Sequence, residues 1–334
     1  MPETINLGFI GTGAWARARH LPALDYIRTS PAGGPDLRLR GVCSLNKQEA
    51  AEVAEQYGFE RVYETIDELV ADDVLDAVAA VVMPVSLEQI LPKLVGAGLP
   101  VLSEKPPGVN HEQAKRFADM VTVPNVVGFN RRYFPIVEKF KAVADELRDA
   151  YYVECSFYRH ERLDSKWHRE RGEGIPFVTG TAIHGINVLE YFFGPVRACR
   201  TTLLDVPSGD MDAWLANLDF ESGLAGRIRI LPCCGSATEG VEVHGRHRSL
   251  YCDFSMYSET DYPGRIVIHE AGKLKEVIQG DASEPRLVNE GFVGEYLDLF
   301  RAITDGPPTR SSFQNAANSM RVAEAIESNT EMTG

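Results

Sequence analysis

The chain lacks long apolar runs, has few cysteines and carries no excess of basic residues. No apolar stretch reaches the roughly 18 residues of a membrane-spanning helix, so we expect no membrane partner. Its 34 Lys and Arg stand against 48 Asp and Glu, a net charge of −14 that disfavours nucleic acid as a partner. The six cysteines form no Cys-x-x-Cys pair and have no His at zinc-finger spacing, so we predict reduced thiols and no metal site. Met1–Ile10 shows no secretory signal, and we expect a cytoplasmic protein.

What is present is the composition of an ordinary soluble globular protein, with 44% apolar and 25% charged residues. At roughly 150 residues per domain, 334 residues predict two domains. We place a dinucleotide-binding domain at 1–125 and a substrate-binding and oligomerisation domain at 126–334. As an alternative to this division of the chain into domains, the C-terminal helices pack back on the first domain.

Strands and helices alternate through the first part of the chain. Four residues at helix starts, each followed by Glu or Gln three positions later, predict capped helices: Asn46, Thr65, Ser86 and Asn110. The alternation predicts right-handed crossovers and a doubly wound parallel sheet. The predicted strands are Ile5–Ile10, Arg38–Ser44, Asp76–Met83, Pro100–Ser103 and Val126–Phe129.

From about residue 150 the apolar residues alternate with period two over successive short runs. Residues 214–220, 224–230, 241–243 and 266–268 show this pattern, which predicts a large open sheet, mixed or antiparallel, with one face on a core. Helices are expected near 182–193, 289–304 and 313–328. The predicted fold class is therefore α/β, with a Rossmann domain followed by an α/β domain.

A glycine turn directly follows the first strand and opens a helix. Gly11 permits the tight turn, Gly13 lets the backbone approach a pyrophosphate, and the small Ala16 lets helix and strand pack. Ala14 and Trp15 complete the turn at the helix N-terminus, where N–H groups and the helix dipole attract phosphate. A purely structural glycine turn is the alternative.

The end of the second strand predicts the choice of cofactor. An Asp or Glu there would bind the ribose 2′-hydroxyl of NAD, but this chain has Ser44, Asn46 and Lys47. A hydroxyl, an amide and an ammonium suit a 2′-phosphate, so NADP(H) is the preferred cofactor and NAD(H) the second. Alternatively, Asn46 only caps its helix and Lys47 is solvated.

Further motifs follow two of the later predicted strands. Pro84 follows the strand Asp76–Met83, and Glu104-Lys105-Pro106 follows the strand that ends at Ser103. Strand ends of such sheets face the ligand crevice, so Lys105 can donate to a substrate oxygen near a nicotinamide.

The chain resembles the Gfo/Idh/MocA family of dehydrogenases. The resemblance rests on Gly11–Ala16, Pro84, Glu104–Pro106, Asn130–Tyr133 and His184. It implies a Rossmann domain, a C-terminal α/β domain whose open sheet often forms the oligomer interface, and NAD(P)-dependent oxidation or reduction of a sugar, polyol or related hydroxyl compound. It also implies that Lys105 lies beside the nicotinamide and the substrate.

By the same resemblance, His184 gives or takes the proton, and packing within its helix is the alternative role. The family commonly has Asp four residues before this histidine and another three after it, where this chain has Gly180 and Asn187. The absence of Asp at position 180 puts the Asp-His relay that is usual in the family in doubt. Asn187 is either a substrate ligand or a polar residue of the helix.

Candidate substrate-binding residues lie in two further segments. Arg131 and Tyr133 border the cleft by resemblance, and are otherwise ordinary residues of a helix start. The basic stretch Arg159–Arg171 includes Trp167, whose ring could stack on a sugar; a solvated loop or a subunit contact is the alternative.

We predict an NAD(P)-dependent oxidoreductase that acts on CH–OH groups of a sugar-like substrate, assembled as a homodimer or homotetramer. Two alternatives remain: a cofactor-binding regulatory protein that has lost catalysis, and a redox-neutral lyase or glycosidase with bound NAD.

Overall fold

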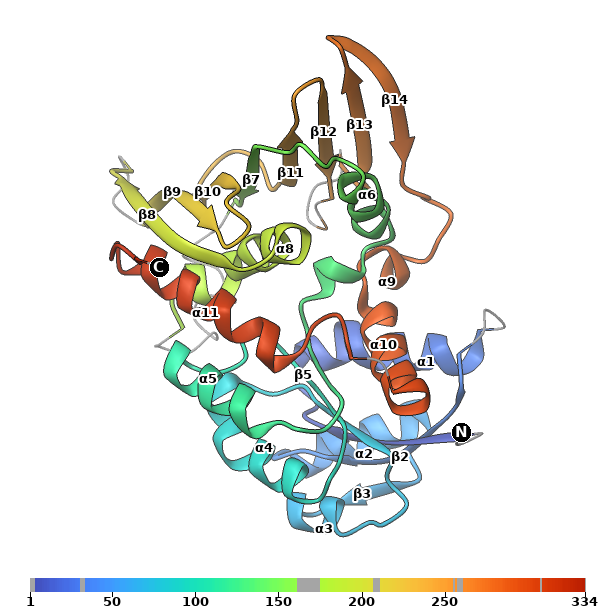
Figure 1. Ribbon diagram of the computed structural model, residues 1–334. Coiled ribbons are helices and arrows are strands. Elements are labelled where there is room, and N and C mark those ends of the chain that lie inside the picture. The colour runs from blue at the N-terminus through green and yellow to red at the C-terminus, as the bar shows by residue number, and fades with distance from the viewer. Residues whose placement is uncertain are drawn as a thin grey trace. The chain divides into compact units, whose positions relative to one another are not determined.

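The structure is a computed structural model of the chain (Figure 1). It describes residues 4–30, 34–160, 175–206, 211–254, 256, 261–306 and 308–333. The chain forms two compact units, each built from two stretches of sequence. The first unit comprises Met1–Tyr133 and Gly291–Ala317, and the second comprises Phe134–Glu290 and Asn318–Gly334.

The first unit contains a six-stranded sheet in the order β3-β2-β1-β4-β5-β6. Every strand pair is parallel, which confirms the predicted doubly wound sheet. The central strand β4 is buried along its whole length, as its continuous apolar sequence predicts. The strands are β1 (Thr4–Ile10), β2 (Asp36–Cys43), β3 (Arg61–Tyr63), β4 (Ala77–Ala80), β5 (Val101–Ser103) and β6 (Asn125–Val127). The helices are η1 (Ala16–His20), α1 (Leu21–Thr29), α2 (Lys47–Tyr57), α3 (Ile66–Val70), η2 (Pro84–Ser86), α4 (Leu87–Gly96), α5 (His111–Met120), η3 (Asn130–Tyr133) and α10 (Phe292–Asp305).

Three of the four predicted helix caps are confirmed. The side chains of Asn46, Thr65 and Asn110 each accept a hydrogen bond from the backbone N–H three residues on. The predicted cap at Ser86 is wrong, because its side chain makes no capping hydrogen bond. Its backbone is already helical, at φ −73° and ψ −21°, because η2 runs directly into α4, whereas a capping residue needs an extended backbone.

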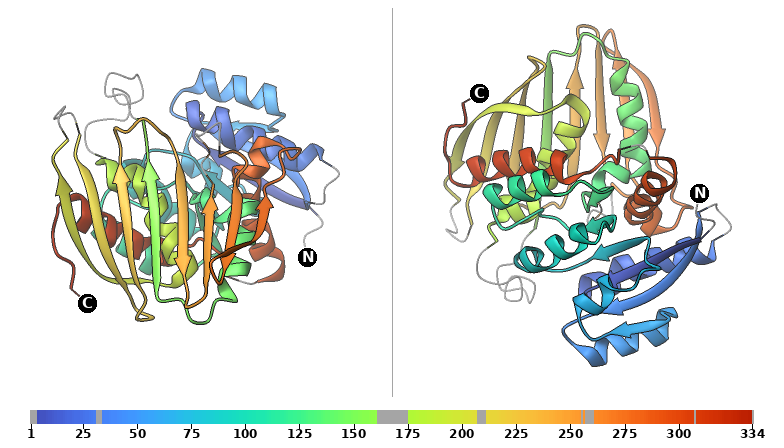
Figure 2. Two further views of the ribbon diagram at one scale, coloured as in Figure 1. Left: turned by 90° about the horizontal axis from the view of Figure 1, so that it is seen from above. Right: turned by 60° about the horizontal axis from the view of Figure 1, so that its bottom comes forward.

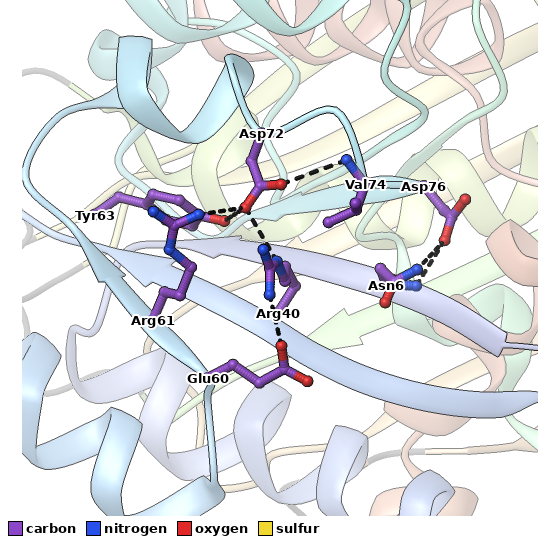
Figure 3. A network of polar contacts seen from close by, with 8 residues as sticks. All are labelled: Asn6, Arg40, Glu60, Arg61, Tyr63, Asp72, Val74 and Asp76. Atoms are coloured by element: carbon purple, nitrogen blue, oxygen red, sulfur yellow. Dashed lines mark hydrogen bonds and ion pairs between the residues drawn. The ribbon is translucent and has the colours of Figure 1, made fainter.

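A polar network fixes β2, β3 and the loop after α3 (Figure 3). The carboxylate of Asp72, 5% exposed, accepts hydrogen bonds from Arg40 Nε at 3.0 Å, Arg61 Nη1 at 3.0 Å and Tyr63 OH at 2.7 Å. Burial alone would raise the pKa of Asp72, but the hydrogen bonds from Tyr63 and Arg40 outweigh burial and lower it. The carboxylate therefore stays ionised where it ties these elements together.

The second unit contains an eight-stranded sheet in the order β14-β13-β12-β11-β7-β10-β9-β8 (Figure 2). Among the described strands of this sheet, only the central β7–β10 pair is parallel, so the sheet is mixed, as predicted. Helices α6 and α8 pack against one face of it and against each other. The strands are β7 (Tyr152–Tyr158), β8 (Val196–Leu204), β9 (Ala213–Phe220), β10 (Ala225–Leu231), β11 (Glu239–His244), β12 (Arg248–Asp253), β13 (Arg265–Glu270) and β14 (Lys273–Gln279). The helices are α6 (Pro135–Asp145), η4 (Val178–Ala182), α8 (Ile183–Phe193) and α9 (Arg286–Asn289), while α11 (Phe313–Glu327) crosses the division between the units.

Candidate functional site

The glycine turn after β1 has the geometry that a dinucleotide requires. Gly11 has φ +98°, and its N–H donates to the carbonyl of Cys43 at 2.9 Å. A side chain on Gly11 would lie 2.2 Å from the carbonyl oxygen of Val81, so only glycine fits. Gly13 is exposed, and nothing lies within 4 Å of the position of a Cβ there. The backbone at Gly13 is therefore open to a pyrophosphate.

The remaining residues of the turn divide between exposed and buried positions. Ala14 is exposed next to Gly13, while Ala16 is buried, as helix–strand packing requires. Trp15 is half-buried, and its indole Nε1 donates to Glu104 Oε1 at 2.9 Å. The dinucleotide turn and the lysine motif are thus joined by a hydrogen bond within the first unit.

The residues after β2 make several contacts of their own. Thr12 Oγ1 donates to Ser44 Oγ at 2.8 Å, and Asn46 caps α2. The Lys47 ammonium donates to the backbone carbonyls of Tyr63, at 3.2 Å, and Glu64. Neither expectation for Lys47 anticipated this anchoring to the end of β3. Pro84 is buried as the first residue of η2, directly after the β4 segment.

Glu104 and Lys105 follow the carboxyl end of β5. Glu104 is 8% exposed, and its Oε2 accepts the backbone N–H of Lys105 at 2.9 Å. Lys105 is half-buried as a residue, just after the end of β5. This places a cation at the strand edge where parallel sheets bind ligands.

Two residues at this site were missed from the sequence. His20, at the end of η1, is fully buried, with Nε2 2.8 Å from Glu104 Oε1 and Nδ1 3.0 Å from the hydroxyl of Tyr296 in α10. The available signal for His20 was a polar residue at the head of an otherwise apolar helical segment, Leu21–Leu24. No local signal pointed to Tyr296, because it comes from a stretch 276 residues away.

Arg131 and Tyr133 lie in η3 and are buried, at 3% and 2% exposure. Arg131 Nη1 donates to Asn130 Oδ1 at 2.9 Å. The Tyr133 hydroxyl donates to Asp298 Oδ2 at 3.0 Å, and the Arg310 guanidinium stacks 4.5 Å from its ring centre. Burial, followed by the charge of Asp298, raises the pKa of Tyr133 well above its ordinary value, so the phenol keeps its proton.

The second unit holds the other candidate residues on α8. His184 and Asn187 are both buried, one helical turn apart. Asn187 Nδ2 donates to Ser319 Oγ at 2.9 Å, and Ser319 Oγ donates to Glu190 Oε2 at 2.5 Å. Gly180 lies in η4, just before this helix. Trp167 lies outside the described residues.

Two general properties hold for the part of the chain that the structure describes. No group of three or more His, Cys, Asp or Glu side chains is arranged to hold a metal ion. No helix there combines the length and the apolar character needed to cross a membrane.

Two family models match the chain. The GFO_IDH_MocA model, described as an oxidoreductase family with an NAD-binding Rossmann fold, matches residues 5–129. The model of the oxidoreductase family's C-terminal alpha/beta domain matches residues 141–331. Both halves of the resemblance inferred from the motifs are thereby confirmed.

Individual proteins are similar over part or all of the chain. Inositol 2-dehydrogenase 2 of Saccharopolyspora erythraea is 30% identical over 227 residues, 65% of this chain and 61% of that protein. An uncharacterized protein of Saccharomyces cerevisiae is 30% identical over 151 residues, 43% of this chain and 41% of that protein. The alignments thus span less than two thirds of these relatives. The solved structure of a levoglucosan dehydrogenase in complex with NADH and levoglucosan has a TM-score of 0.82 at 20% identity, covers 98% of this chain and 97% of its own, and shares the fold.

Proposed function

The chain belongs to the Gfo/Idh/MocA oxidoreductase family, and we propose that it is an NAD(P)-dependent dehydrogenase or reductase acting on a sugar, polyol or related hydroxy or keto compound. The observation that carries this proposal is the 2.9 Å hydrogen bond from Trp15 to Glu104. It joins an open dinucleotide turn to Glu104, the residue before a lysine at the ligand-binding edge of the same sheet.

The residues of the turn fit a bound dinucleotide, since Gly13 leaves its backbone uncovered and the helix N-terminus offers N–H donors. The other residues that we assign to the dinucleotide site shape the backbone around Gly13: Gly11, Ala14, Ala16 and Pro84. The nicotinamide supplies hydride transfer when bound. What remains for the protein is to orient the substrate and to manage one proton.

Lys105 and His184 divide this task in the proposed mechanism. During reduction, negative charge grows on the carbonyl oxygen, and the Lys105 ammonium stabilises it by donating a hydrogen bond. His184 gives the proton that converts this oxygen to a hydroxyl, and takes it back in the oxidation direction. We assign Arg131, Tyr133, Asn187 and Trp167 to substrate binding.

For the cofactor, NADP(H) is the proposed preference over NAD(H). The end of β2 carries no carboxylate at Ser44, where NAD-binding chains bind the ribose 2′-hydroxyl. Ser44 and Asn46 would supply neutral polar groups to the 2′-phosphate of NADP(H). Lys47 would add a positive charge close to this phosphate, although its ammonium also donates to two backbone carbonyls.

The experiment is a turnover assay of the purified full chain with both cofactors in both directions. The substrate panel contains inositol, levoglucosan, and simple aldoses and ketoses. The variant Lys105→Met should lower kcat by about 10²–10³-fold while cofactor affinity is retained. The control is Lys93→Met, since Lys93 is a surface residue of α4 whose ammonium pairs with Asp67 at 2.6 Å. Tight cofactor binding without turnover of any compound would instead favour the cofactor-binding regulatory protein.

A further inference from the structure

The carboxylate of Glu104 is buried among N–H donors from two segments. Trp15 Nε1 and His20 Nε2 both lie within 2.9 Å of Oε1, and the backbone N–H of Lys105 donates to Oε2 at 2.9 Å. A carboxylate only accepts hydrogen bonds, so Nε2 of His20 carries the hydrogen. With N–H donors on both oxygens, the orientation of this side chain is fixed.

The chain of hydrogen bonds continues to α10. Burial, followed by the charges of Glu295 and Glu104, raises the pKa of Tyr296 well above its ordinary value, so its hydroxyl keeps its proton. In the neutral imidazole, Nδ1 of His20 then accepts from Tyr296 O–H at 3.0 Å. The Glu104 carboxylate therefore fixes the His20 tautomer, and the Tyr296 hydroxyl, which can donate or accept, donates to Nδ1 in that tautomer.

The two buried carboxyls of this region take opposite protonation states. Burial alone would raise the pKa of Glu104, but the hydrogen bond from His20 and the charge of Lys105 contribute to holding it below its ordinary value. Burial, followed by the charge of Glu104, raises the pKa of Glu295 well above its ordinary value, against the opposing charge of Arg131. Glu104 is thus the ionised member of the pair. Among the described residues, the titratable and charged groups that act on or respond to Glu104 are His20 on η1, Lys105 on its own loop, and Glu295 and Tyr296 on α10, while Arg131 on η3 acts on Glu295.

We propose that Glu104 is a positioning residue that, anchored by Trp15 and His20, holds Lys105 in place and keeps its side chain positively charged. Two charges that attract each other do so reciprocally, so the carboxylate that Lys105 stabilises also stabilises the ammonium of Lys105. Lys105 then acts as a charged hydrogen-bond donor rather than as a base. The inference rests on the proposed function for the use of Lys105, but the charge relation can be measured without turnover.

The test is competitive acetylation of the purified full chain with trace acetic anhydride between pH 6 and 11. Only the free amine reacts, so the labelling of the Lys105 peptide, measured by mass spectrometry against pH, reports the ionisation of this side chain. Glu104→Gln should move the midpoint to lower pH by about one unit, which is about a tenfold rise in free amine below the midpoint. Glu104→Asp keeps the charge but shortens the side chain, so its midpoint should stay near that of the wild type while kcat falls.

The matched control is Asp76→Asn. Asp76 is a carboxylate of the same unit that accepts two N–H bonds from Asn6, at 2.8 and 3.0 Å, beside the amino end of β4 (Figure 3). Its substitution should leave the Lys105 midpoint unchanged.

Trp15→Phe keeps a ring but removes the donor that anchors Oε1, which lets the carboxylate turn away from Lys105, so the midpoint should shift in the same direction as in Glu104→Gln by a smaller amount. If Glu104→Gln does not fold, the Lys105 midpoint of Trp15→Phe tests the proposal instead. An unchanged Lys105 midpoint in folded Glu104→Gln, or in Trp15→Phe when it is the deciding variant, overturns the proposal. If the variants shift the Lys105 midpoint but the wild type turns over no substrate, the proposed function is refuted, while the effect of Glu104 on the charge of Lys105 still holds.

Discussion

Substituting the first glycine of the dinucleotide turn should damage the fold before it affects binding. In Gly11→Ala the new methyl group would lie 2.2 Å from the carbonyl oxygen of Val81 and 3.0 Å from its carbonyl carbon. Both are backbone atoms next to the central strand β4, so they cannot rotate away. The backbone at Gly11 also has φ +98°, which an alanine adopts only with strain.

The loss of folding free energy in Gly11→Ala follows from the backbone strain and from the close contact with Val81. A left-handed backbone costs about 1–2 kcal/mol for a residue with a Cβ, and overpacking a buried contact costs about 1–3 kcal/mol, so the sum is about 2–5 kcal/mol. For a unit of this size, each kcal/mol lowers the Tm by roughly 2–4 °C. Gly11→Ala should therefore lower the Tm of the first unit by roughly 4–20 °C.

Gly13→Ala is the matched substitution with the opposite expectation. Nothing lies within 4 Å of its Cβ position, and its φ is outside the left-handed region, so stability should change by less than about 1 kcal/mol. If the pyrophosphate occupies this open space, the methyl group displaces it from the backbone N–H donors. Losing one charge-assisted hydrogen bond of about 1.5–3 kcal/mol weakens binding roughly 10- to 150-fold.

The two variants are compared by thermal unfolding and by fluorescence titration with NADH and NADPH. Wild-type stability of Gly11→Ala would refute the packing argument at Val81. Wild-type cofactor affinity of Gly13→Ala would show that the cofactor does not approach this turn, and the proposed function would lose its first support.

Three further outcomes follow from the structure. Ser44→Asp should lower the affinity for NADPH relative to NADH by about tenfold or more in the same titration, because a carboxylate at the end of β2 repels a 2′-phosphate. Asp72→Asn should cost about 1–3 kcal/mol of unfolding free energy at pH 7. The folded pKa of Asp72 lies below its unfolded one, so this stabilisation is present above a pH of about 4 and is lost as the pH falls through the folded pKa. Denaturant titrations should therefore show the stabilities of the two proteins converging as the pH falls below about 4. Glu239→Gln should cost about 3–5 kcal/mol, measured by urea unfolding, because it leaves the buried Arg159 guanidinium without its carboxylate; the exposed Glu331→Gln should cost less than about 1 kcal/mol.

The elements that carry local signals could be predicted from the sequence. The turn at Gly11, the caps at Asn46 and Asn110 and the fully apolar β4 each depend on residues within a few positions of one another. The prediction at Ser86 failed for an equally local reason, since Pro84 starts the helical turn two residues earlier, and the extended residue before it is Met83, whose side chain makes no capping hydrogen bond.

Features that depend on distant segments could not be predicted in this way. Strand β7 alternates buried and half-exposed residues as clearly as any predicted strand, yet its parallel partner β10 lies far along the chain. The assembly of His20, Glu104 and Tyr296 joins η1, the loop after β5 and α10. A single sequence contains no pattern that pairs such positions, because each looks locally like an ordinary polar residue.

The second unit shows what stands in place of the carboxylates that the resemblance leads one to expect near His184. Position 180 is a glycine whose N–H donates to the carbonyl of Pro176 at 2.9 Å. Asn187 donates to Ser319, which in turn donates to Glu190, so this amide helps bind α8 to the C-terminal segment. A carboxylate beside a histidine favours the imidazolium, and neither of these two positions supplies one. On the proposed mechanism, stabilising the developing oxyanion falls mainly to Lys105, and the carboxylate that we propose to position this residue and keep it charged is Glu104 in the first unit.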